Sequence, residues 1–281
     1  MHYRVTNDII TFIANTKGAE IVSLFCNGRE RLWQNETGEW DGHAPALFPV
    51  CGNCAVRING KDYPVKKHGF AKTGEFEVIE RGDDFIAFRL ESDEETKRVF
   101  PFDFAFTVRY RLCGSSVEII YETENTGDEP LYFSCGGHES FAFESEVEHY
   151  EVRFEKQEKL VTLVHNDEGR LTGEERTLSE HGVLPLKAEY FQNGNTLIFG
   201  GIKSRRAALC ERGGKWVAET EFEGFSNLLL WKPERTKMLC MEPWLNLPDR
   251  VGERKEFSAK GGVLCVEPQK TKRLIRKIRY D

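Results

Sequence analysis

The sequence lacks long hydrophobic runs, and no segment approaches the about 20 consecutive apolar residues that a membrane-spanning helix needs. Residues 1–20 also lack the apolar stretch of a secretory signal. Helical periodicity sustained over about ten residues is absent too. We therefore expect a cytoplasmic protein with no membrane partner and little helix.

Motifs for nucleotides and for metalloprotease zinc are missing: the chain has no G-x-G-x-x-G, no G-x-x-x-x-G-K and no H-E-x-x-H. Acidic residues outnumber basic ones, 46 Asp and Glu against 39 Lys and Arg, so the net charge is −7 and the pI is about 5.7. The one basic run, "KTKRLIRKIRY" at the C-terminus, is interpreted as a closing strand with a solvated face, with a nucleic-acid arm as the alternative. We expect no cofactor and no nucleic-acid partner.

Eight cysteines are present, mostly inside strand-like apolar segments, which favours reduced thiols over a disulfide framework. Cys51 and Cys54 form a Cys-x-x-Cys pair, and Cys135 and His138 form a Cys-x-x-His pair. Together they match a Cys₃His zinc set, so a structural zinc site is one alternative, and a redox role for Cys51 and Cys54 is another. Neither pair shows the turns of a zinc knuckle or a βαβ context, and we expect no metal.

Alternation of apolar and polar residues is the dominant pattern of the sequence. In "FDFAFTVRYRL" the apolar side chains share one parity and hence one face of a strand: Phe102, Phe104, Phe106, Val108, Tyr110 and Leu112. "VEIIYETEN" repeats the pattern after a "CGSS" turn, and "FEVIERGDDFIAFRLES" predicts a second hairpin. We predict an all-β fold, a large antiparallel β-sandwich forming a single domain over residues 1–281, with a helical turn or two near "RERLWQNE".

Three stretches depart from this strand pattern and carry candidate catalytic groups. They are residues 44–72 with His68, "SCGGHESFAF" with His138, and "MLCMEPWLNLPDR" with Glu242. Each residue alone has a structural interpretation, as a turn cap, a core histidine or a strand end. Their occurrence together favours a functional site.

The chain resembles the aldose 1-epimerase (galactose mutarotase) family, in particular its lactose-operon-associated, LacX-like branch. The resemblance runs in order through "GAEIVSL", "ALFPVCGN", "YPVKKHGFAK", "FPFDFAFTVRYRL", "YFSCGGHESF", "NTLIFGGIKS", "CMEPWLNLPDR" and "FSAKGGV". It implies the galactose mutarotase-like supersandwich and cofactor-free interconversion of the α and β anomers of an aldose. The implied partner is a small sugar, and we expect a monomer or homodimer.

Carried over to this sequence, the resemblance assigns His138 as general acid, Glu242 as general base and His68 as a second substrate-binding histidine. Ring opening needs a base at the anomeric hydroxyl and an acid at the ring oxygen, on opposite sides of the hemiacetal. A carboxylate partly desolvated by Trp244 and Pro243 would be a stronger base than an exposed one. Trp244, Trp33 and Phe70 are available to stack on a sugar.

Two positions depart from the family pattern. Asn53 stands where relatives carry a substrate-binding arginine, and Arg57 is the candidate to replace it. Where an acidic residue would hold a sugar hydroxyl, the chain offers Gln192, Asn193 and Asn195. The sugar is therefore left open. The alternatives are a hexose phosphate, met by Arg57, Lys66, Lys67 and Lys72, and a non-catalytic carbohydrate-binding or sensing protein.

Overall fold

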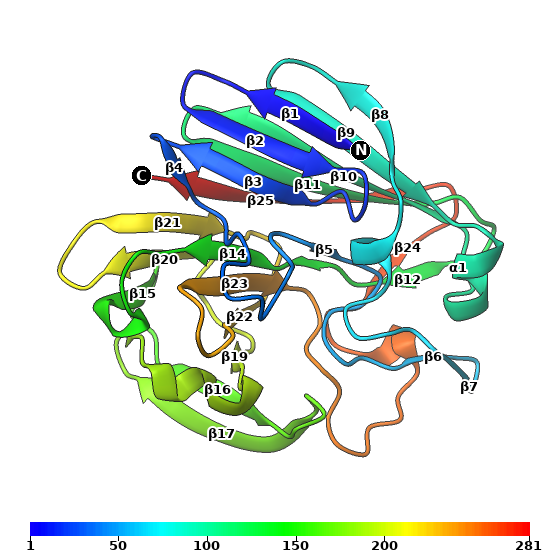
Figure 1. Ribbon diagram of the computed structural model, residues 1–281. Coiled ribbons are helices and arrows are strands. Elements are labelled where there is room, and N and C mark those ends of the chain that lie inside the picture. Colours follow the sequence, from blue (N-terminus) through cyan, green and yellow to red (C-terminus); the bar gives the residue numbers. More distant parts are fainter.

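The computed structural model describes residues 1–281, and most of its regular structure consists of antiparallel strands (Figure 1). The largest sheet has nine strands in the following spatial order: β18 (Val183–Pro185), β15 (Tyr150–Phe154), β20 (Arg206–Glu211), β21 (Trp216–Glu221), β25 (Thr271–Tyr280), β11 (Ser116–Asn125), β10 (Phe104–Cys113), β9 (Phe85–Glu91) and β8 (Glu77–Arg81).

The second sheet has eight strands and carries the candidate catalytic residues. Seven form a continuous order: β17 (Leu171–Ser179), β16 (Leu160–His165), β19 (Leu197–Phe199), β22 (Asn227–Trp231), β23 (Met238–Trp244), β13 (Gly136–Gly137) and β5 (Ala46–Leu47). β14 (Glu139–Ala142) continues the line of β13 and pairs with β23.

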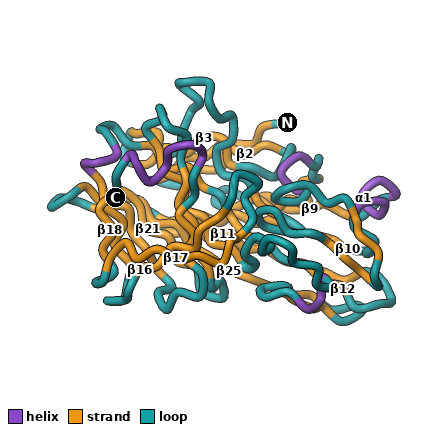
Figure 2. The backbone as a smooth tube through the Cα atoms, turned by 90° about the horizontal axis from the view of Figure 1, so that it is seen from below, coloured by secondary structure: helices purple, strands orange, loops and turns teal.

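Three smaller sheets complete the fold. They are a four-stranded sheet of β1 (His2–Thr6), β2 (Ile10–Asn15), β3 (Ile21–Cys26) and β4 (Arg29–Glu30), and the pairs β12 (Leu131–Phe133) with β24 (Leu264–Val266) and β6 (Val56–Ile58) with β7 (Lys61–Tyr63). Short helices occupy connections between strands (Figure 2): α1 (Glu94–Val99), η1 (Ala71–Thr73), η2 (Val147–His149), η3 (Ala188–Gly194) and η4 (Phe257–Ala259). None of them has the length and apolarity to cross a membrane.

Aromatic side chains join the sheets through one main core of 59 buried residues. Phe12 of β2 contacts Tyr110 of β10, and Phe141 of β14 contacts Tyr280 of β25. Phe48, which follows β5, stacks on Phe106 of β10 with ring centroids 4.3 Å apart. The four-stranded and eight-stranded sheets therefore both pack against the nine-stranded sheet, which confirms the predicted antiparallel sandwich.

The predicted hairpins are present. β10 pairs with β11 in a register that places Leu112 opposite Val117, and β8 pairs with β9. The alternating side chains of β10 are buried from Phe104 to Leu112, as their parity predicted. Phe102 continues the parity but lies before the strand begins.

Three segments differ from expectation. The helical turn expected near "RERLWQNE" is absent, and β4 lies there instead, because Arg29 and Glu30 pair with the end of β3. Helix α1 was not predicted. It is only six residues long and is held by a capping box in which Asp93 accepts from the Thr96 amide and Thr96 from the Asp93 amide. The basic run forms β25 as predicted, but Arg276 points inward and is buried.

Removing the ring of Phe106 should test the packing contact between the two large sheets. We expect Phe106→Ala to lower the free energy of unfolding by about 3–5 kcal/mol, because a buried aromatic leaves a cavity. Phe25→Ala is the matched control, since Phe25 is 47% exposed, and it should change stability by less than about 0.5 kcal/mol. Urea unfolding measures both. Equal losses would show that the stacked rings do not join the sheets.

Candidate functional site

Strand β23 is buried along its whole length, on both faces. Leu239 and Met241 point into the main core, while Cys240 and Trp244 belong to separate small clusters on the opposite face. Because side chains alternate along a strand, Glu242 shares this second face with Cys240 and Trp244. The continuous apolar run "MLCM" thus brings a carboxylate into a site shielded from water.

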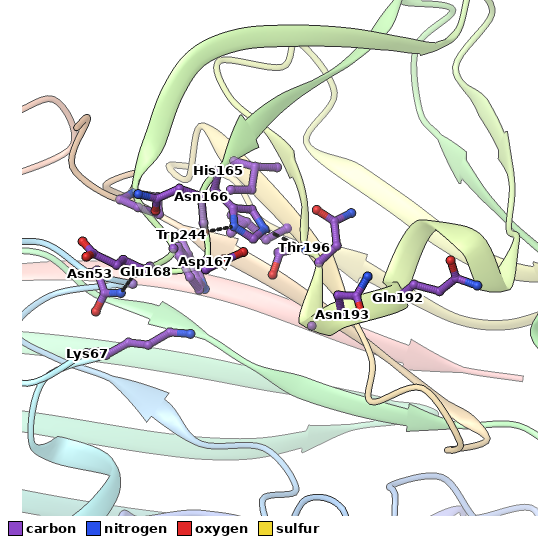
Figure 3. Close-up of a pocket in the computed structure, with 17 residues that line it drawn as sticks. Asn53, Lys67, His165, Asn166, Asp167, Glu168, Gln192, Asn193, Thr196 and Trp244 are labelled. Carbon is purple, nitrogen blue, oxygen red and sulfur yellow. Dashed lines mark hydrogen bonds between the residues drawn. The ribbon is translucent and has the colours of Figure 1, made fainter.

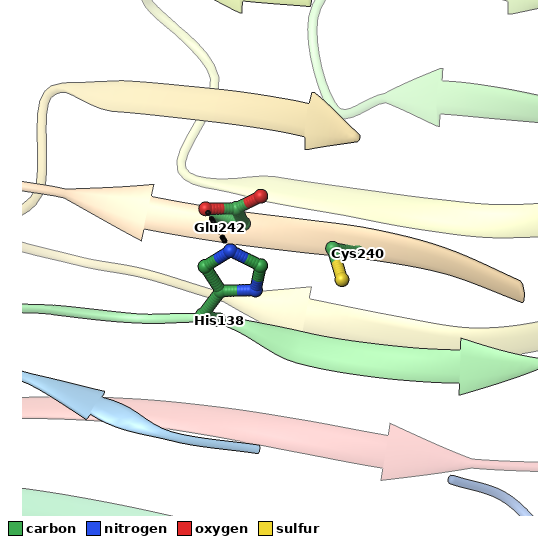
Figure 4. A group of neighbouring side chains, drawn as sticks. All are labelled: His138, Cys240 and Glu242. Atoms are coloured by element: carbon green, nitrogen blue, oxygen red, sulfur yellow. Dashed lines mark ion pairs between the residues drawn. The ribbon is translucent and has the colours of Figure 1, made fainter. Parts of the chain in front are cut away.

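His138 lies between β13 and β14, directly beside Glu242. β14 pairs with β23 so that Glu139 is opposite Met241 and Ser140 is opposite Cys240. Continuing that register places His138 against Glu242. The Nε2 atom of His138 lies 3.2 Å from a carboxyl oxygen of Glu242 (Figure 4).

Burial decides the protonation of this pair. Desolvation raises the pKa of Glu242 well above its usual value and lowers the pKa of His138 well below its own. Burial therefore favours the neutral form of both groups, with the proton of the pair on Glu242 rather than on His138. Trp40 stacks on the His138 ring at a centroid distance of 5.2 Å, and Trp231 packs edge-on against it. The two indoles shield the pair from solvent.

His68 approaches from the other side of the cavity, and its backbone is held in the left-handed region with φ 68°. At the following Gly69, also left-handed, a Cβ atom would collide with the Phe48 carbonyl oxygen. The His68 Nδ1 atom accepts a hydrogen bond from the Gly52 amide at 3.1 Å, so the ring proton resides on Nε2. Burial, and then the neighbouring His138, holds the pKa of His68 well below its usual range. His68 is thus a neutral N–H donor.

These residues line one cavity of about 640 Å³. His68, His138, Glu242 and Trp244, all predicted from sequence, lie together in its wall. Sequence reasoning missed other members of the wall: Glu20, Trp40, Asp41, Thr196 and Trp231. Trp40 comes from an irregular loop with no strand or family pattern to mark it.

A second cavity of about 500 Å³ adjoins the first and shares Lys67, Gly194, Thr196 and Trp244 with it. Figure 3 shows its polar side chains, which come from three segments: Asn53 and Lys67, Asp167 and Glu168 of the β16–β17 turn, and Gln192 and Asn193 of η3. Asn53 therefore lines the adjoining cavity, and its side chain donates to the Glu168 carbonyl. Asp167 and Glu168 are the acidic residues in the wall of this cavity.

Arg57 lies outside the walls of both cavities. Its guanidinium contacts carboxylates of Asp62 at 2.8 Å and Glu256 at 3.4 Å. The aromatic candidates Trp33 and Phe70 also lie outside, packed in core clusters.

The Cys₃His zinc set does not assemble. All eight cysteines are free, and Cys51, Cys54 and Cys135 do not gather with His138 into a cluster of ligand atoms. The group that does gather around His138 contains Cys240 and Glu242 instead.

Comparison with known proteins agrees with this geometry. The family model for aldose 1-epimerase matches residues 1–186. The chain belongs to the aldose 1-epimerase family. Protein LacX (chromosomal) of Lactococcus lactis subsp. lactis is 27% identical over 97% of this chain and 94% of its own length.

Solved structures of relatives share the whole architecture. A galactose mutarotase related enzyme from Lactobacillus acidophilus is 26% identical, with a TM-score of 0.93 over 100% of this chain and 97% of its own. A galactose mutarotase-like protein from Lactobacillus casei superposes over the full length of both chains with a TM-score of 0.93 at 24% identity, which supports the same fold.

In this family member, a buried ion pair fixes the backbone next to His138. Arg276 of β25 donates from both terminal guanidinium nitrogens to the two carboxyl oxygens of Glu139, and it also donates twice to the Tyr121 hydroxyl. The guanidinium lies against Gly137, where any Cβ atom would collide with it. Glu139 and Gly137 flank His138, so β25 locks the segment that carries the imidazole.

Breaking this ion pair should cost far more than breaking an exposed one. We expect Glu139→Gln to destabilise the protein by about 3–5 kcal/mol, because Arg276 is left buried without a carboxylate. Glu91→Gln removes an exposed partner of Arg89 and should cost at most about 1 kcal/mol. Urea unfolding at neutral pH compares the two. A similar small loss for both would contradict the structural role of the pair.

Proposed function

We propose that the protein is an aldose 1-epimerase that interconverts the α and β anomers of an aldohexose or related sugar. One observation carries the proposal. A carboxyl and an imidazole lie 3.2 Å apart in the wall of a sugar-sized cavity, with a second histidine facing them. Family membership supports the same reaction class.

The reaction needs two proton transfers. A base removes the proton from the anomeric hydroxyl while an acid protonates the ring oxygen, and the ring opens to the aldehyde. Rotation about the C1–C2 bond and reclosure then give the other anomer. We assign Glu242 as the base and His138 as the acid, and His68 donates its Nε2 proton as a hydrogen bond to the sugar.

The direct contact of His138 with Glu242 bears on these roles. Burial favours the shared proton on Glu242, whereas the proposed roles need it on His138. A bound sugar brings hydroxyl donors to the carboxylate, and hydrogen bonds to the charged form stabilise it. The pair holds one proton in either arrangement, so substrate binding itself can transfer that proton to the imidazole. The sugar then lies between the two groups in place of their direct contact.

The decisive experiment measures anomer exchange by NMR or polarimetry, starting from fresh α-glucose, α-galactose and glucose 6-phosphate. Wild type should accelerate exchange of at least one sugar, and Glu242→Gln and His138→Asn should each lose at least about 10²-fold in kcat, the usual contribution of an acid or base. Glu223→Gln and His181→Asn change exposed residues and serve as controls.

Sugar binding without acceleration by wild type would overturn the enzymatic assignment. It would favour the alternative of a carbohydrate-binding or sensing protein. Full activity of both variants would instead overturn the roles of Glu242 and His138.

An anionic sugar is the second candidate substrate, and unpaired lysines favour it. Lys67 and Lys72 line the cavity, and neither forms an ion pair with a carboxylate. Burial, followed by repulsion from Lys67, lowers the pKa of Lys72. Asp41 and Glu20, in the same wall, act on Lys72 in the opposite direction, so Lys67 is the cation with which a phosphate or carboxylate on the sugar would pair. We infer that a phosphorylated hexose fits the cavity better than its neutral parent.

The ratio of kcat/KM for glucose 6-phosphate to that for glucose tests this inference. Lys67→Met should lower the ratio about tenfold or more, since a charge-assisted hydrogen bond contributes about 1.5–3 kcal/mol. Lys66→Met is the matched control, because Lys66 is exposed and lies outside the cavity wall. An unchanged ratio in Lys67→Met would exclude Lys67 from phosphate recognition.

A further inference from the structure

Cys240 lies next to the catalytic pair and takes no part in the proposed reaction. It shares one face of β23 with Glu242 and is fully buried. A ring nitrogen of His138, the thiol sulfur of Cys240 and a carboxyl oxygen of Glu242 all lie within 4.8 Å of one another (Figure 4). A metal ion bound between them would need only small side-chain movements to reach all three.

The three donors are those that zinc prefers: imidazole nitrogen, thiolate sulfur and carboxylate oxygen. The charge of these donors also matches that of a zinc ion. One thiolate and one carboxylate neutralise a divalent cation once zinc has displaced their protons, and imidazole binds zinc in its neutral form. The bound set would therefore carry no net charge, which offsets the repulsion from Lys67 and suits a site with little water.

One contact within the protein involves the donors: the His138 Nε2 atom lies 3.2 Å from a carboxyl oxygen of Glu242, and a bound ion would replace that contact. The Nδ1 atom of His138 is buried and has no hydrogen-bond partner in the protein. Ser140 is the polar neighbour on the same face. Its hydroxyl already donates a hydrogen bond to the His43 carbonyl at 2.6 Å and so does not donate to the three metal ligands. His138 and Glu242 line the cavity, so an ion has a route to the cluster and an open coordination position for water.

We propose that His138, Cys240 and Glu242 form a binding site for a single zinc ion, which blocks the catalytic pair when it is occupied. Zinc takes the lone pairs with which His138 and Glu242 would exchange protons with the sugar. The inhibition rests on the proposed function, whereas the binding does not.

Binding is tested directly on reduced protein with Zn²⁺ and Co²⁺ in a non-thiol reductant. We expect one ion per chain by equilibrium dialysis, and a sulfur-to-metal charge-transfer band with Co²⁺ that reports the thiolate. Cys240→Ser should abolish the band and weaken zinc binding by about tenfold or more. Cys210→Ser, at another buried free cysteine in the nine-stranded sheet, is the matched control and should leave both unchanged. Thermal unfolding verifies that both variants are folded.

Activity supplies the second readout. Zinc should inhibit anomer exchange by wild type and by Cys210→Ser, and inhibit Cys240→Ser only at a concentration about tenfold higher or more. Absence of stoichiometric binding to wild type, or a charge-transfer band that survives in Cys240→Ser, would overturn the site. If no sugar is turned over, the proposed function fails, but the dialysis and the cobalt spectrum still decide the metal site.

Discussion

The site depends on one constraint, the burial of β23 on both of its faces. A strand in the middle of a sheet presents alternate side chains to opposite sides, so the same seven residues serve two environments. Leu239 and Met241 hold the strand to the core, and this anchoring fixes Cys240, Glu242 and Trp244 on the other face. The position of the carboxyl group is therefore set by hydrophobic packing.

Burial also sets the chemistry of the pair. A carboxyl group in water is ionised at neutral pH and would favour a protonated imidazole beside it, but desolvation favours the neutral form of both groups. The two groups lie 3.2 Å apart, and their neutral forms avoid the cost of a buried ion pair. Behind them, Arg276 and Glu139 are charged and equally buried, yet they satisfy each other with two hydrogen bonds. The Arg276–Glu139 pair holds the backbone rigid. In the proposed reaction the adjacent His138–Glu242 pair exchanges a proton.

The sequence predicted the strands and the four candidate residues of the first cavity better than it predicted the loop residues around them. Parity identified the buried face of β10, and the family pattern identified His68, His138, Glu242 and Trp244, which the structure brings into one cavity. Arg276 was misjudged because a basic run in a strand usually faces water, and only the distant Glu139 explains its burial. Trp40 and Asp167 come from loops, whose side chains meet the cavity through tertiary contacts that no local pattern encodes.

This division between strands and loops has a functional consequence. The proposed proton-transfer groups, His138 and Glu242, are carried on or beside paired strands, whose positions the core fixes. The charged and amide groups of the surrounding wall, Lys67, Asp167 and Asn193, lie on connections between strands. Replacing a loop residue leaves the register of β14 and β23 intact, so substrate preference can change while the reaction is retained. Asn53, which stands where the resemblance to the family places an arginine, lines the adjoining cavity and is not part of the contact between His138 and Glu242.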